Sequence, residues 1–386
     1  DPFHRHASCS CPMCGLCQDE CEEVMEALRK TGRLDNTLLI ITGDNGDSFP
    51  RAKSNLYDLG CHVPFAVRWP GVIKPGSVCD GFVSLMDLAA TFYEAAGVKP
   101  KEKMDSRSLI PVFKGDYTAC RKEIYSDRER HTNTRPGGYG YPMRSVQDKD
   151  FLYIRNLYPD RLPAGTDPVY GDTGHGPAKA FMVFQRDKYP KEIFDRAFGL
   201  RPAEELYDLR KDPGCLNNVA DSVSYAKKKK KMSRRLTSWM KRTSDPRGDP
   251  GNLCFDTLPY VRKAMRIALI ETEGCLKDSH GKDIDWVRAQ IEKLRKQGVK
   301  VIELRAAGDL TEYVAALNNI KDQNALTGRE ITLLSGTETG ILAAKEAGII
   351  PAGVTWGGTD AKTMVMSGAS YVLTNQEELE LCLDFL

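Results

Sequence analysis

A carboxylate and an amide follow directly on a short apolar run near the beginning of the chain. Residues 37–42 (TLLIIT) have the pattern of a buried strand, and Asp44 and Asn45 come just after them, between two glycines. At the carboxyl end of a parallel strand, both side chains would reach the crevice outside the sheet. Their oxygens are hard ligands that suit Ca²⁺ or Mg²⁺. Asp-Asn-Gly is also a common turn sequence, so a turn and a metal site both remain open.

A second set of potential ligands is the cysteine cluster formed by Cys11, Cys14, Cys17 and Cys21. Its C-x2-C-x2-C-x3-C spacing matches that of bacterial ferredoxin ligands, although Glu22 stands where a proline is usual. Four thiolates this close in sequence also suit Zn²⁺. Zinc, an iron–sulfur cluster and free thiols therefore remain three open interpretations.

The elements that must position these residues alternate between helix and strand patterns in two stretches of the chain. In residues 22–115, amphipathic helices are predicted at 22–30 and 82–96 around the strand at 37–42, which favours a mostly parallel sheet. The buried face of the second helix is predicted from Leu85, Leu88, Phe92 and Ala95. The second stretch, residues 260–386, has a helix pattern at 285–297 and strand patterns at 266–270, 300–304, 331–334, 352–355 and 369–373.

Between these stretches, residues 116–256 are richer in Tyr, Arg, Pro and Gly. Residues 151–155 (FLYIR) alternate like a strand with one exposed face. Residues 225–241 predict a basic helix with Leu236 and Trp239 as apolar anchors. Its five consecutive lysines at 227–231 are either a solvated helix face or a surface for sulfated polysaccharide or phosphate.

Bulk properties exclude some classes of function. The 386-residue chain has a formal net charge of +2, so its overall field favours neither nucleic acid nor an anionic membrane surface. No apolar run reaches the roughly 18 residues that a membrane-spanning helix needs. We expect three domains, at residues 1–115, 116–256 and 260–386.

Several short motifs follow Asp44 in a fixed order. They read PRAKSNLYD from Pro50, HVPF from His62, RWPG from Arg68, RERH from Arg128, GYPMRSV from Gly140 and PAEELYDL from Pro202. In this order they resemble the sulfatase family, and the later motifs resemble its heparan N-sulfatase (sulfamidase) branch. The resemblance extends over about residues 22–245. It implies an alkaline-phosphatase-like α/β fold with a smaller α+β subdomain, and hydrolysis of a sulfated saccharide.

The resemblance also implies roles for individual residues. Asp44 and Asn45 would ligate the divalent cation, usually calcium in this family, and Lys53 would contact the sulfate. A cation at that point lowers the cost of charge developing on the transferred group. The first five residues, DPFHR, resemble the family's Asp-Pro-His-Arg with one residue inserted. His4 would then contact the sulfate and could protonate the leaving group.

Arg130 and His131 of the RERH motif would face the sugar. The family's nucleophile, a formylglycine made within Cys/Ser-x-Pro/Ala-x-Arg, has no counterpart in this sequence, and neither have two further metal-binding aspartates. Gly43 replaces the family's Ser, and Asp47 stands where a small or apolar residue is usual. We therefore expect the missing groups to come from an amino-terminal half that acts as a partner of this chain.

The last stretch has two acidic residues after its first predicted strand, Glu271 and Glu273, and two glycines after a later one, Gly336 and Gly340. These segments resemble the catalytic and metal motifs of haloacid-dehalogenase-like phosphatases, over about residues 265–384. Both motif aspartates of the first segment are replaced by glutamates, and those of the later segment by glycines that offer no ligand. The resemblance implies a Rossmann-like fold that has lost its chemistry.

Two functions from different classes follow. One is a calcium-dependent sulfatase acting on a sulfated sugar, incomplete in this chain. The other is a catalytically inactive sulfatase–phosphatase-like fusion that serves as a binding or scaffold protein. The presence or absence of a formylglycine motif elsewhere in the protein distinguishes the two.

The 386 residues by themselves are expected not to hydrolyse sulfate esters, because they lack the nucleophile motif. Release of inorganic sulfate from an aryl sulfate by the purified chain, with and without Ca²⁺, measures this. Metal-dependent turnover above the buffer rate would contradict the expectation.

Overall fold

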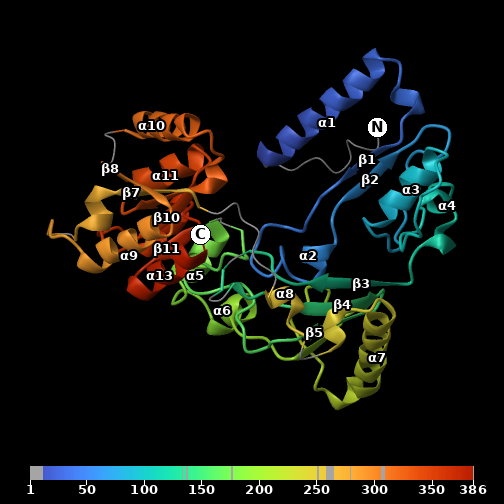
Figure 1. Ribbon diagram of the computed structural model, residues 1–386. Coiled ribbons are helices and arrows are strands. Elements are labelled where there is room, and N and C mark those ends of the chain that lie inside the picture. The colour runs from blue at the N-terminus through green and yellow to red at the C-terminus, as the bar shows by residue number, and fades with distance from the viewer. Residues whose placement is uncertain are drawn as a thin grey trace. The chain divides into compact units, whose positions relative to one another are not determined.

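The computed structural model describes residues 12–132, 134–135, 138–174, 177–249, 252–257, 265–278, 280–305 and 309–385 (Figure 1). The chain divides into two compact units. Unit 1 takes in the described residues up to Asp44 together with His62–Tyr125 and Val146–Phe151. Unit 2 contains Asn45–Cys61, Ser126–Ser145 and Leu152–Leu386. The three domain ranges expected from the sequence stay a prediction.

Unit 1 begins with helix α1 (Pro12–Lys30), which is longer than predicted and ends at a glycine in the left-handed region, Gly32 with φ of 67°. The predicted strand is present as β1 (Leu39–Thr42). It pairs with β2 (Phe65–Arg68) in antiparallel register, so the mostly parallel sheet predicted for this stretch is wrong for its described strands. An apolar run predicts a strand but carries no information about the direction of its partner.

Helix α3 (Asp87–Ala95) starts five residues later than predicted and presents a different face to the interior. Its buried residues are Asp87 and Thr91, whereas Leu85 and Phe92 are 38% and 49% exposed. Backbone amides and a guanidinium donate hydrogen bonds to the two buried polar side chains. Because these partners come from distant segments, the helix register could not be predicted from its apolar residues. The short helix α4 (Ile110–Phe113) follows.

A four-stranded sheet has the order β3-β4-β5-β6, with bounds Glu123–Arg128, Met143–Asp148, Phe151–Asn156 and Glu204–Asp208. The predicted strand at 151–155 is β5, but its first four residues are all buried. The interpretation of an exposed face is therefore wrong, because β5 is an inner strand of this sheet. Four short helices lie before, between and after these strands along the chain: α2 (Asp58–Cys61), α5 (Pro177–Phe184), α6 (Lys191–Phe198) and α8 (Cys254–Thr257).

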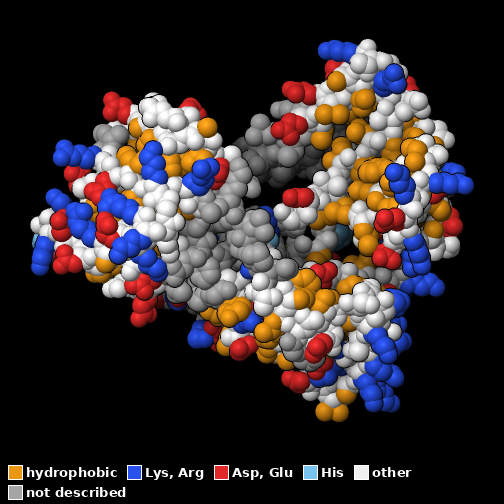
Figure 2. All heavy atoms as spheres, in the orientation of Figure 1, with side chains coloured by type: hydrophobic (Ala, Val, Ile, Leu, Met, Phe, Trp, Pro, Cys, Tyr) orange, Lys and Arg blue, Asp and Glu red, His pale blue; other side chains and the backbone are white. Residues whose placement is uncertain are grey.

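The predicted basic helix is α7 (Ala226–Arg242). It buries Met232, Leu236 and Met240, which lie four residues apart on one face, and leaves Trp239 half-buried. Figure 2 shows Lys and Arg side chains gathered along this helix. Of its lysine run, Lys229 pairs with Glu204 at 3.2 Å. Whether the other lysines bind a polyanion stays a prediction.

The last part of unit 2 is a five-stranded sheet of order β11-β10-β9-β7-β8, in which every strand pair is parallel. The strands are β7 (Ile267–Glu271), β8 (Lys300–Leu304), β9 (Ile331–Ser335), β10 (Ile350–Val354) and β11 (Tyr371–Leu373). The helices are α9 (Asp285–Lys296), α10 (Leu310–Gln323), α11 (Glu338–Glu346), α12 (Ala361–Ser367) and α13 (Gln376–Phe385). All five predicted strands are confirmed with ends shifted by two residues or fewer.

Each face of this parallel sheet is covered by its own core. Successive residues of β7 point to opposite faces, so Ala268 and Ile270 pack with α9 and α13, and Ile267 and Leu269 pack with α10 and α11. Because both faces are covered, the first four residues of β7 are all apolar, and Glu271 ends the strand. The mixed α/β class predicted from the sequence is confirmed. Within the described part of the chain, every helix is too short or too polar to cross a membrane.

Candidate functional site

The segment after the Asp44-Asn45 pair folds into a compact loop of unit 2. Gly46 is required there, because a Cβ at this position would collide with the Leu59 carbonyl oxygen. The Asp47 amide donates to that same carbonyl (3.1 Å), and the Lys53 amide donates to the Asp47 carbonyl (2.8 Å). The loop is therefore closed on itself, and its own backbone fixes the position of Lys53.

Arg51 anchors this loop to the strand–turn region beyond β6. Its Nη2 donates to the Cys215 carbonyl at 2.6 Å and to the Tyr207 hydroxyl at 3.2 Å. Its guanidinium carbon lies 3.9 Å from the centre of the Tyr57 ring, within the range of a cation–π contact. Arg51 has φ of 67°, a conformation that the loop imposes on it.

Asn55 and Tyr57 tie the same loop to the buried interior of unit 2. The Asn55 Oδ1 accepts from Arg201 (2.7 Å), and its Nδ2 donates to the Lys53 carbonyl (2.9 Å). The Tyr57 hydroxyl donates to Glu205 at 2.7 Å. Burial and the nearby Glu205 charge raise the pKa of Tyr57 to about 12, so the hydroxyl remains a donor at neutral pH. These buried polar contacts hold the backbone that carries Lys53.

The predicted metal ligands and sulfate-contacting residues have different surroundings. Asp44 and Asn45 are exposed. The Asn45 Nδ2 donates to the Gly46 carbonyl at 2.9 Å, so the Oδ1 of Asn45 is the side-chain atom that could bind a cation. Lys53 is half-buried. His4 lies outside the described residues.

The cysteine cluster is covered only in part. Cys11 lies outside the described residues, and of Cys14, Cys17 and Cys21 only Cys21, half-buried on α1, has a described side chain. Among the described side chains, no group of three or more His, Cys, Asp or Glu is arranged to hold a metal ion. The zinc and iron–sulfur interpretations stay predictions.

The most heavily bonded carboxylate of this region is Asp172, only 2% exposed. Its Oδ2 accepts from Nη2 of Arg128 (2.6 Å) and of Arg135 (2.7 Å). Its Oδ1 accepts from the Thr132 amide (3.0 Å) and hydroxyl (2.6 Å). The Nδ1 of His131 lies 3.3 Å from the same oxygen. One carboxylate thus joins the loop after β3 to the segment around residue 172.

Burial alone would raise the pKa of Asp172. The hydrogen bond from His131 and the charges of Arg128 and Arg135 outweigh burial, so the pKa of this carboxyl lies well below its usual range. Asp172 is therefore ionised at every pH at which the protein would function. A permanent anion at Nδ1 fixes the orientation of the His131 ring.

His131 and Arg130, predicted to face the sugar, lie at the edge of this cluster. The His131 side chain is 37% exposed, and because its Nδ1 faces Asp172, Nε2 is the ring nitrogen left for a ligand. Arg130 donates to the Gly138 carbonyl at 3.0 Å. A Cβ at Gly174 would collide with the Ser48 hydroxyl, so the loop that carries Lys53 packs against the segment that carries Asp172.

The electrostatic character of this region is cationic. The buried Arg128, Arg135 and Arg201 have guanidinium carbons 5.5, 5.8 and 5.9 Å from the centre of the Tyr141 ring. Burial lowers the pKa of Lys179 to about 8, and the Asp172 charge opposes that shift. The described residues of this region include four buried cations, Arg128, Arg135, Lys179 and Arg201, and two buried anions, Asp172 and Glu205. Such an excess favours an anionic ligand at the adjoining surface.

Sequence reasoning did not find Asp172, Arg135 or Arg201. Each lies in a stretch of Pro, Gly and Thr or outside any motif, and their partners are up to 146 positions away. The local signal for Arg128 and His131 was the RERH motif itself.

The carboxyl edge of the parallel sheet is the second region in which the sequence resembles catalytic and metal-binding motifs. Glu271, 0% exposed at the end of β7, accepts hydrogen bonds from Tyr313 (2.8 Å), Ser335 (2.7 Å), the Gly336 amide (3.2 Å) and Thr337 (3.1 Å). Burial raises the pKa of Glu271, and these hydrogen bonds oppose the rise. Its carboxylate oxygens are already engaged in hydrogen bonds inside the protein.

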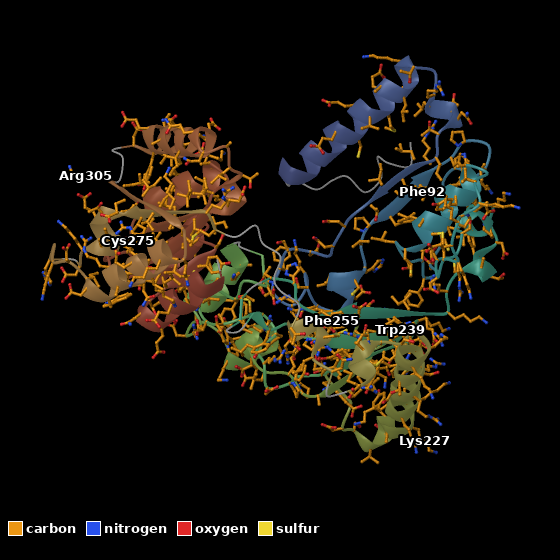
Figure 3. The ribbon with its side chains drawn as sticks, in the orientation of Figure 1. Phe92, Lys227, Trp239, Phe255, Cys275 and Arg305 are labelled. Atoms are coloured by element: carbon orange, nitrogen blue, oxygen red, sulfur yellow. The ribbon has the colours of Figure 1, made fainter. Side chains whose placement is uncertain are left out.

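Glycines from three loops close this same edge. A Cβ at Gly336 would lie 2.6 Å from the Gly274 backbone, and a Cβ at Gly357 would also collide with Gly274. The Trp356 indole donates to the Cys275 carbonyl at 3.0 Å and lies above it. Cys275 is buried, and Arg305, which follows β8, is exposed (Figure 3). The backbones of these loops therefore pack directly against one another at this edge.

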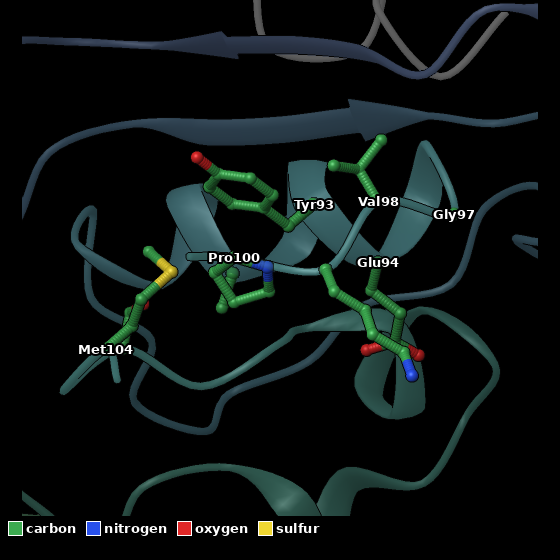
Figure 4. A pocket seen from close by; sticks show the side chains of 9 residues that line it. Tyr93, Glu94, Gly97, Val98, Pro100 and Met104 are labelled. Carbon is green, nitrogen blue, oxygen red and sulfur yellow. The ribbon is translucent and has the colours of Figure 1, made fainter. Parts of the chain in front are cut away.

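Unit 1 has a separate surface pocket of about 470 Å³ at the carboxyl end of α3. Figure 4 shows Tyr93, Val98, Pro100 and Met104 along it, with Glu94 at one side. The pocket is lined by none of the residues that sequence reasoning selected, and it adds nothing to the site.

Comparison with known proteins gives these observations a context. The family model for sulfatases matches residues 18–98. An ulvan-active sulfatase of Formosa agariphila is 33% identical over 58% of this chain and 41% of its own length. Human N-sulphoglucosamine sulphohydrolase is 30% identical over 58% of this chain and 45% of its own length.

The chain resembles sulfatases over more than half its length. It spans less than half the length of these two relatives. Among solved structures, BT4656 in complex with its substrate D-glucosamine-2-N,6-O-disulfate is 23% identical, with a TM-score of 0.43 over 59% of this chain and 38% of that one. An overlap of this extent does not assign a fold. The family model and these two relatives support the sulfatase resemblance predicted from the motifs, over the part of the chain that they match.

Replacing Gly340 by alanine should destabilise the parallel-sheet region, because the added Cβ would collide with Glu271 and Ser335. We expect a loss of roughly 1–3 kcal/mol in the free energy of unfolding. Urea unfolding followed by the fluorescence of Trp286 and Trp356, which pack 4.8 Å apart, measures it. Gly248→Ala, with no atom within 4 Å of the added carbon, is the control and should change little. Equal stabilities of the two variants would contradict this account.

Asp172→Asn should destabilise unit 2 by roughly 3–5 kcal/mol, because two buried guanidiniums lose their counter-charge. The folded pKa of Asp172 lies below the unfolded value of about 3.9, so its contribution is present above pH ~4 and is lost as pH falls further. The Asp172→Asn variant should therefore not show the part of the acid destabilisation that protonation of Asp172 causes in the wild type. The exposed Asp187→Asn is the matched control. Coinciding acid-unfolding curves for wild type and Asp172→Asn would rule the assignment out.

Proposed function

We propose that this chain is the part of a calcium-dependent sulfatase that binds and orients a sulfated saccharide. The observation that carries the proposal is His131, held by the buried Asp172 beside the loop that carries Lys53. The names of the relatives point the same way, since ulvan and N-sulphoglucosamine are both named as their substrates. The alkaline-phosphatase-like fold of the family is part of this proposal.

Each residue has a distinct role in the proposed site. Lys53 places a positive charge beside the sulfate and stabilises the charge that develops on its oxygens. The Nε2 of His131 and the guanidinium of Arg130 bind the sugar at the cationic surface. His4 would act as proton donor to the leaving group. The buried cations behind His131 attract the anionic substrate toward this surface.

Calcium belongs to the proposal as a family expectation. Asp44 and Asn45 are adjacent, exposed and bear oxygen donors, which fits a hard cation. Two residues do not fill a calcium coordination sphere of roughly 6–8 oxygens, so further ligands must come from other segments. When bound, the ion would add positive charge at the sulfate. The nucleophile and the remaining ligands would come from sequence outside these 386 residues.

A second proposal concerns the five-stranded domain. We infer that it has a haloacid-dehalogenase-type fold without phosphatase chemistry, serving as a binding or scaffold module. The closed glycine contacts and the fully hydrogen-bonded Glu271 support this reading. The inactive fusion considered from the sequence stays the alternative for the whole chain.

The affinity of the full chain for D-glucosamine-2-N,6-O-disulfate tests the main proposal. Titration calorimetry in Ca²⁺ and in chelator should show tighter binding in Ca²⁺. Lys53→Met and His131→Ala should each weaken binding roughly 10- to 100-fold, the range of one lost charged hydrogen bond.

The exposed Lys74→Met and His280→Ala are matched controls and should bind like the wild type. Wild-type affinity in both the Lys53 and His131 variants would refute the proposed site. Binding that is strong but indifferent to Ca²⁺ would instead favour the non-catalytic alternative.

A further inference from the structure

Two cysteines of unit 1 lie against each other although 41 positions separate them. The Sγ atoms of Cys79 and Cys120 are 3.4 Å apart, and both side chains are half-buried. A disulfide requires about 2.05 Å, so the sulfurs must approach by only about 1.3 Å. The two thiols are therefore close to bonding distance in the reduced protein.

The backbone beside the two cysteines is already joined. Phe82 and Arg121 form an antiparallel bridge in which the Arg121 amide donates to the Phe82 carbonyl at 3.0 Å. The Arg121 Nε also donates to the buried Asp87 at 2.8 Å. These bonds hold the segment of Cys120 next to the segment of Cys79 in the reduced protein, so most of the entropy cost of bringing the thiols together is already met by the fold.

Gly81 permits the contact. A Cβ at this position would lie 2.5 Å from the Cβ and Sγ of Cys120 and 3.5 Å from the sulfur of Cys79. Only a residue without a side chain lets the Cys120 sulfur lie against the backbone and reach Cys79. The absence of a side chain at Gly81 is thus a condition for the contact between the two sulfurs.

We propose that Cys79 and Cys120 are a disulfide-forming pair that reacts with a small-molecule disulfide such as oxidised glutathione. The thiolate of Cys79 attacks one sulfur of the reagent, breaks its S–S bond and releases one thiolate. The thiolate of Cys120 then attacks the Cys79 sulfur of the mixed disulfide and releases the second. Two protons leave the protein, its two thiols are oxidised, and the reagent is reduced to two thiols.

The order of attack follows from the surroundings of Cys120. The Cys120 side chain packs against the Gly81 backbone, and burial and the hydrogen bond with Cys79 raise the pKa of its thiol to about 11, so we assign Cys120 the second step. Of the other described cysteines, Cys215, Cys275 and Cys382 are buried and so less accessible to the reagent.

The bond would close a loop that contains α3, α4 and the surface pocket at the end of α3. A cross-link of this span restricts the unfolded state and stabilises the folded one. Oxidation would therefore stabilise unit 1 without changing the residues of the proposed sulfatase site.

The test incubates the full chain with oxidised glutathione under native conditions, alkylates free thiols with iodoacetamide and maps peptides by mass spectrometry without reductant. Wild type should give a peptide pair joined through Cys79 and Cys120. Cys120→Ser should instead trap glutathione on Cys79, and Cys79→Ser should give no cross-link. The melting temperature of the oxidised wild type should rise by roughly 5–10 °C over that of the reduced protein.

Gly81→Ala keeps both thiols and should form the cross-link several-fold more slowly, whereas Gly248→Ala should match the wild type. Circular dichroism of the reduced variants establishes that each is folded. Recovery of both cysteines in alkylated form, or of each as a separate glutathione adduct, in folded wild type would overturn the proposal. Equal rates in Gly81→Ala and wild type would overturn the role of Gly81.

Discussion

The ion pairs of Asp172 are the interaction on which the candidate site depends. A carboxylate that is 2% exposed is stable only if its charge is matched, and here two guanidiniums, a hydroxyl and an amide match it. These donors come from the end of β3 and the loop that follows it, and the acceptor comes from a segment about 40 positions later. Removing the carboxylate would leave cations buried without a partner. The same bond therefore fixes the fold of the two segments and the ring of His131.

The parallel sheet was predictable because its signal is local. Its inner strands are short, mostly apolar runs between helices of ordinary length, because both faces of these strands are buried. Helix α3 shows the opposite case, since its buried residues are Asp87 and Thr91, whereas its apolar residues are exposed or half-buried. The direction of β2 relative to β1 likewise depends on tertiary pairing that no single segment encodes. Predictions failed where polar residues take core positions and where the outcome depends on a distant partner.

The candidate site was predictable only where a motif exists. Lys53 and His131 were selected because their neighbours resemble a family, yet what positions them is a set of buried residues with no motif of their own. Arg201 reaches Asn55 across 146 positions, and Asp172 reaches His131 across 41. Such pairs form only in the folded chain and produce no periodic pattern in the sequence. The residues expected to act on the substrate can therefore be selected from the sequence, whereas the residues that orient them are found only in the folded structure.

The glycines at the edge of the parallel sheet restrict which substitutions this domain accepts. Gly274, Gly336 and Gly357 pack backbone against backbone, and Gly340 adjoins Glu271. An acidic side chain at position 336 or 340 would require the opposing groups to move, since each single replacement meets a collision. Substitutions at these positions are therefore coupled, and a side chain that could bind a ligand cannot be introduced there one residue at a time.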